Sequence, residues 1–121
     1  MIDNKQYQIN GFNIIQVSDA YLEGFDGMNY EAAQFYEFPH RLGKQDILIN
    51  EESGFNLKVH TIIHEITECK WMREGLKYWT AHTFAEVAEN DPVNLEQTSS
   101  FIYRNIELYE YLLTGTGDSQ L

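Results

Sequence analysis

The stretch between residues 57 and 74 constrains the fold more than any other part of this chain. Its apolar residues recur at the spacing of an α-helix that buries one face, and they are Val59, Ile62, Ile63, Ile66 and Cys69. Gly75 stands where such a helix ends. A second helix is expected from Thr80 to Asp91, where proline follows, and a third from Leu95 to Leu113. The tail after Thr114 is expected to fray.

The first half of the chain has the features of strands and loops. A β-favouring run from Tyr7 to Val17 contains Asn10-Gly11, a pair typical of hairpin turns. A short apolar run from Asp46 to Asn50 predicts another strand. The segment from Leu22 to Gly43 is expected to be mostly irregular, with a short helix near residues 31–35.

These patterns predict an α+β fold with a small N-terminal sheet followed by three helices. The chain has 121 residues, which is enough for one domain over residues 1–121 and leaves no room for a second. Its hydrophobic fraction of 43% supplies enough apolar material for a compact core.

The strong negative charge excludes some classes of partner. The 8 Lys and Arg residues are outnumbered by 19 Asp and Glu residues, which gives a net charge of −11. Such a surface repels nucleic acids and anionic membranes but suits the binding of cations. We therefore expect no nucleic-acid or membrane partner. A peptide or small-molecule substrate and a protein partner both stay open.

The expected compartment is the cytoplasm. Cys69 is the single cysteine, so it cannot form an internal disulfide, and this favours a reducing compartment. No run approaches the roughly 20 apolar residues of a membrane span. The first ten residues also lack the apolar core of a signal peptide.

One polar strip of the first predicted helix carries residues capable of chemistry. His60, His64 and Glu68 are spaced four apart, so neighbours lie only about 40° from one another around the helix. The strip points away from the apolar face and is expected to face water or a cleft. Glu65 lies about 100° from His64. It is therefore placed to take a proton from a water on a metal at His64, as a general base does.

The second predicted helix repeats this arrangement with His82, Glu86 and Glu89. The short connection from Gly75 to Trp79 allows the two helices to run antiparallel, so their polar strips can meet. Two imidazoles and several carboxylates suit a divalent metal, and zinc binds such groups at roughly 2.0–2.2 Å. Zinc is the expected cofactor, with manganese, iron and nickel as other candidates.

The residues His64-Glu65-Ile66-Thr67-Glu68 resemble the HExxH helix of zinc-dependent metallopeptidases, the zincins, with Glu in place of the second His. More narrowly, residues 64–89 are similar to small phage and bacterial proteins with a zincin-like pattern, HExxE…AHxxAxxxE. The resemblance implies a minimal zincin-like core in which strand 46–50 forms the sheet edge beside the helix. It also implies a hydrolase of peptide or amide bonds.

The resemblance also implies roles for individual residues. Glu65 would be the general base, and the metal ligands would be His64, Glu68, His82 and Glu89. Glu89 could instead support a ligand. The departure at Glu68 adds negative charge, which lowers the Lewis acidity of the metal. A purely structural metal is therefore an alternative.

Two further readings compete with the hydrolase. The carboxylate pairs at positions 65/68 and 86/89 resemble those of all-α nucleotide pyrophosphohydrolases of the MazG type, which use magnesium. However, magnesium needs neither histidine, and the strand-like first half does not suit an all-α fold. The other reading is a non-enzymatic accessory protein of a phage or mobile element, in which the cluster holds a structural metal.

Other polar and aromatic residues are expected to have ordinary structural roles. His60 is expected to be a neighbour of the site rather than a ligand, and His40 a loop residue away from it. Cys69 lies on the apolar face and is expected in the core. Trp71, Tyr78 and Trp79 are expected to pack between helices, with Tyr78 as a candidate to line the cleft and donate to an oxyanion.

Overall fold

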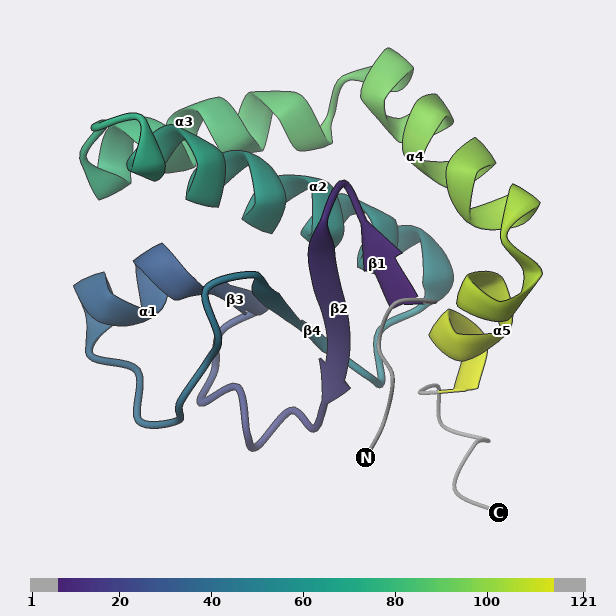
Figure 1. Cartoon of the computed structure of the whole chain (residues 1–121), viewed down its shortest axis with the longest axis horizontal. Coiled ribbons are helices and arrows are strands. Elements are labelled where there is room, and N and C mark those ends of the chain that lie inside the picture. The colour runs from purple at the N-terminus through teal and green to yellow at the C-terminus, as the bar shows by residue number, and fades with distance from the viewer. Residues whose placement is uncertain (1–6, 115–121) are drawn as a thin grey trace.

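The computed structural model describes residues 7–114. They form a four-stranded sheet and five helices, which confirms the predicted α+β class (Figure 1). In chain order the elements are β1 (Gln8–Ile9), β2 (Phe12–Val17), β3 (Gly27–Asn29), α1 (Tyr30–Tyr36), β4 (Asp46–Asn50), α2 (Phe55–Arg73), α3 (Tyr78–Glu89), α4 (Pro92–Arg104) and α5 (Ile106–Thr114).

The sheet has the strand order β1-β2-β4-β3. β1 and β2 form the expected hairpin, and both residues of its turn adopt positive φ, 52° at Asn10 and 82° at Gly11. β4 pairs in parallel with β2 and antiparallel with β3. β4 is therefore a central strand, so the expectation that strand 46–50 forms the sheet edge is wrong. The edge beside it is β3.

α2 packs across one face of the sheet, and α3 lies alongside α2 (Figure 1). The main core lies between this face and the helices, and it includes Ile14, Ile47, Ile49, Val59, Ile62, Ile66 and Cys69. The opposite face of the sheet is covered by the segment between β2 and β4, through a second cluster that includes Leu22, Met28, Leu42 and Leu48. The predicted apolar face of the first long helix is confirmed.

Side chains alternate along the sheet, and this alternation decides what β3 presents to α2. Gly27 and Asn29 pair with Ile49 and Ile47, which belong to the core under α2, whereas Met28 pairs with Leu48 on the other face. Gly27 permits a close approach, because a Cβ there would lie 2.6 Å from the Thr61 methyl group. β3 thus brings the Asn29 side chain against α2.

The helix boundaries agree with the prediction at α2 and differ further along the chain. Gly75 ends α2 with a φ of +106°, as expected. Asp91 caps α4 by accepting a hydrogen bond from the Val93 amide. The single helix expected over 95–113 is wrong, since the chain leaves the helical conformation at Asn105, with φ −107° and ψ 93°. The Asn105 side chain accepts from the Leu108 amide, and α5 begins there.

None of the helices within residues 7–114 is long and apolar enough to cross a membrane. The tail after Thr114, where fraying is expected, lies outside the described residues.

Candidate metal centre

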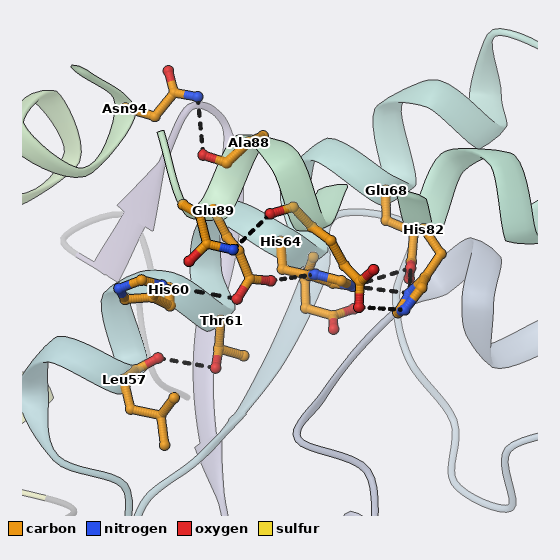
Figure 2. A network of polar contacts seen from close by, with 12 residues as sticks. Leu57, His60, Thr61, His64, Glu68, His82, Ala88, Glu89 and Asn94 are labelled. Carbon is orange, nitrogen blue, oxygen red and sulfur yellow. Dashed lines mark hydrogen bonds and ion pairs between the residues drawn. The ribbon is translucent and has the colours of Figure 1, made fainter. Parts of the chain in front are cut away.

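The polar strips of α2 and α3 meet, as the short connection between the helices predicts. The Nε2 atom of His64 lies 3.2 Å from the Nδ1 atom of His82. The Oε2 atom of Glu68 lies 3.2 Å from that His64 nitrogen and 2.8 Å from that His82 nitrogen. Figure 2 shows the three side chains converging from the two helices. Two imidazole nitrogens and one carboxylate oxygen therefore form a small triangle.

This triangle fits a tetrahedral zinc ion. Ligand atoms about 2.0–2.1 Å from zinc lie about 3.3 Å from one another at tetrahedral angles. The separations of 2.8–3.2 Å between the donors of His64, Glu68 and His82 are close to that value. Within the part of the chain that the structure describes, these are the three residues that could hold a metal ion together. Three protein donors leave a fourth position for water or substrate, which is typical of catalytic zinc.

Each histidine also contacts a carboxylate through its other ring nitrogen. Glu89 Oε1 lies 2.6 Å from His64 Nδ1, and Glu86 Oε2 lies 3.3 Å from His82 Nε2. Figure 2 shows His64 between Glu89 on one side and Glu68 and His82 on the other. Such a contact fixes the orientation of a metal-binding imidazole and raises its basicity. Glu89, expected either as a metal ligand or as a support for one, contacts His64 and lies outside the triangle.

Glu68 lines a cavity and does not face open water, which is the second of the two positions expected for its strip. Its side chain is only 2% exposed and contacts Asn29 of β3 and His82 of α3, and Glu65 is buried on the same helix. Asn29, itself fully buried, donates through Nδ2 to Oε1 of Glu65 at 2.8 Å and to Oε1 of Glu68 at 3.1 Å. The second oxygen of Glu68 is thereby left to face the histidines.

The crowding of carboxylates shifts two pKa values. Burial, reinforced by the charge of Glu68, raises the pKa of Glu65 to about 8, although His64 and the Asn29 hydrogen bond oppose the shift. Burial alone would lower the pKa of His64, but its hydrogen bonds with Glu68 and Glu89 and the negative charges of Glu65 and Glu68 raise it to about 9. Burial thus favours the protonated form of Glu65, and the neighbouring carboxylates favour the protonated form of His64.

The triangle opens into a cavity of about 380 Å³ between α1, α2, α3 and the segment leading into β3. His64, Glu65, Glu68 and His82 all line it. Tyr78 also lines it, with its hydroxyl 3.3 Å from His82 Nδ1 and accepting a hydrogen bond from Tyr36. The site therefore combines buried donors with room for a ligand.

The remaining sequence predictions concern residues outside the triangle. His60 is a neighbour, 3.8 Å from Glu89, and His40 stacks on Tyr21 away from the cavity. Cys69 is fully buried in the core, as expected. Trp71 contacts Phe84 of α3 and Trp79 contacts Phe35 of α1, so both lie between helices as expected, with 41% and 61% of their surfaces exposed.

Sequence reasoning missed Asn29, because it lies in a three-residue strand within a segment expected to be irregular. A strand this short gives no period that could have identified it.

Comparison with protein-family models, with curated proteins and with solved structures gave no match.

Proposed function

We propose that this protein is a zinc-dependent hydrolase that cleaves a peptide or amide bond. The observation that carries the proposal is the triangle of His64 Nε2, His82 Nδ1 and Glu68 Oε2, with a carboxylate on the far nitrogen of each histidine. Two imidazoles and a carboxylate form a donor set that zinc accepts. Bound there, zinc supplies a Lewis acid that polarises a carbonyl and lowers the pKa of water towards neutrality.

The residues around the triangle have separate tasks in this proposal. Glu65, which lines the same cavity, accepts a proton from the attacking water and passes it to the departing amine as the C–N bond breaks and a C–O bond forms. Tyr78 has its hydroxyl in the cavity and receives a hydrogen bond from Tyr36, so its own proton can be donated to the carbonyl oxygen of the substrate.

Two observations disfavour a nucleotide pyrophosphohydrolase. The four-stranded sheet does not suit an all-α fold. A triphosphate also needs cationic side chains, and none of the described residues that line the cavity is Lys or Arg.

The first test is the metal content of the purified protein. We expect elemental analysis to find about one zinc per chain, and zinc titration to give more than 100-fold weaker binding in His64→Ala and in His82→Ala. Loss of a residue that supports a ligand weakens metal binding roughly 10–100-fold, and loss of the ligand itself should weaken it more.

His40→Ala is the matched control, because it removes a histidine that stacks on Tyr21 outside the cavity. It should bind zinc like the wild type. Absence of any bound transition metal, or equal binding by all three variants, would contradict the proposal. A well-folded protein insensitive to chelators would favour the accessory-protein reading instead.

A further inference from the structure

The cavity beside the triangle has an unbalanced charge. Among the described residues that line it, the carboxylates are Asp26, Glu65, Glu68, Glu86 and Glu89, and no ammonium or guanidinium group faces them. The three cationic residues of α2, which are Lys58, Lys70 and Arg73, do not line the cavity. Lys58 donates to Gln16 and to the Leu112 carbonyl, and Arg73 pairs with Glu31.

A divalent ion does not remove this imbalance, because acidic residues other than the ligand Glu68 also line the cavity. Glu68 would be used by the ion itself, and Glu86 and Glu89 hold the histidines. Asp26, which is exposed in the segment leading into β3, contacts neither histidine. Glu86 is also 60% exposed. The mouth of the cavity therefore keeps a negative potential that attracts cations.

The walls of the cavity are aromatic. Phe25, Tyr36 and Tyr78 line it, and their rings form a continuous series with centroid separations of 4.6 Å and 5.1 Å. Aromatic faces bind ammonium and guanidinium groups, and they also pack against the aliphatic stems that carry those groups. Carboxylates and aromatic rings in one cavity thus suit a long side chain with a cationic end.

We infer that the substrate presents a lysine or arginine side chain next to the bond that is cleaved. This inference rests on the proposed function, because it assigns a substrate class to the same cavity. The metal triangle positions the carbonyl, the aromatic walls receive the stem of the neighbouring side chain, and Asp26 and Glu86 at the mouth attract its charge. Acidic side chains are repelled from the same place.

The test uses N-acetyl amino-acid hydroxamates, which bind zinc through the hydroxamate and differ only in the side chain. Calorimetry with the zinc-loaded protein would compare the lysine, norleucine and glutamate compounds. Norleucine matches the stem of lysine without its charge. We expect the lysine compound to bind about 10-fold more tightly than norleucine, and glutamate more weakly than both, as Coulomb attraction at a partly solvated site predicts. The preference should shrink in high salt.

Asp26→Asn tests the charge at the mouth, and Glu96→Gln on exposed α4 is the matched control outside the cavity. The first should reduce the lysine preference roughly threefold, and the second should leave it unchanged. Equal binding of the lysine and norleucine compounds would overturn the inference while the hydrolase proposal stands. Failure of every hydroxamate to bind would overturn both.

Discussion

α2 carries two groups of buried charged residues, and they differ in their charge and in what surrounds them. Lys58, near the start of the helix, is fully buried, and its Nζ atom donates to Gln16 Oε1 at 2.5 Å and to the Leu112 carbonyl at 2.6 Å. Two turns further along, Glu65 and Glu68 are buried as a pair and share the amide of Asn29. The first group is one cation among neutral acceptors. The second is two carboxyl groups that share one amide donor, and Glu68 also contacts the two histidines of the site.

The two groups also differ in which parts of the fold surround them. Gln16 donates through its side chain to the Tyr111 carbonyl and through its backbone amide to the Tyr111 hydroxyl, so the contacts of Lys58 tie β2 and α2 to α5. The carboxylate pair instead lines a cavity. A buried charge with matched acceptors links elements of the fold. A buried pair of carboxylates beside an opening supports the metal site that we propose.

The largest effect is expected from Glu65→Gln. The amide keeps an oxygen for Asn29 to donate to, but it cannot take up a proton from water. We expect hydrolysis of a basic peptide to fall by about 10²–10⁴-fold, the usual contribution of a general base. Zinc content should stay at the wild-type level. Initial rates and elemental analysis on the same sample check both, and an unchanged rate would assign Glu65 to structure, like Lys58.

A smaller and purely structural effect is expected from the titration of Lys58. Burial lowers its pKa from 10.5 to about 8, against the opposing charge of Glu51. Between these two values the unfolded chain holds the proton and the folded chain does not, so raising the pH favours folding. Relative to Lys58→Met, the wild-type free energy of unfolding should rise by about 3 kcal/mol from pH 7 to pH 11.

Urea unfolding measures this difference, and an added chelator removes any contribution of bound metal to the free energy of unfolding. Lys70→Met is the matched control, because Lys70 is exposed on the same helix and should show no such pH-dependent difference. If Lys58 behaves like Lys70, its charge is hydrated in the folded protein, and its site is not the closed one described above.

The convergence of the two histidines was predictable from sequence because it depends on short-range geometry. Spacings of four residues fix which side chains share a helix face, and the short link between Gly75 and Trp79 limits how the next helix can return. The same reasoning located strand 46–50 and α1. This reasoning requires either a regular spacing of apolar residues or clear turn residues at the ends of an element. Strand 46–50 and α1 each meet one of these conditions.

The depth of the site was not predictable, because it depends on a partner distant in sequence. Glu68 is buried, and its partner Asn29 of β3 lies 39 residues away from it along the chain. Likewise, the break at Asn105 depends on one side chain capping α5 within a continuous apolar period. In both places one hydrogen-bonding side chain decides the local structure. The sequence around that side chain has no pattern that predicts this role.

The smallest predicted effect concerns Asn29, which has two roles that can be separated. Its Oδ1 atom caps α1 by accepting from the Ala32 amide, while its Nδ2 atom holds the two carboxylates. Serine can also cap a helix but is too short to bridge the carboxylates. We expect Asn29→Ser to bind zinc about 10–100-fold more weakly, as loss of a partner that orients a ligand usually does.

Asn29→Ala loses the cap as well, so it should weaken zinc binding to the same extent and cost about 1 kcal/mol more in unfolding free energy than Asn29→Ser. Competition with a fluorescent chelator and urea unfolding of the metal-free variants give the two quantities separately. If the zinc affinity of the two variants falls in step with their unfolding free energy, Asn29 acts only as a helix cap. Equal loss of binding in both variants would mean that this one amide makes the crowded carboxylates of α2 a defined site for a cation.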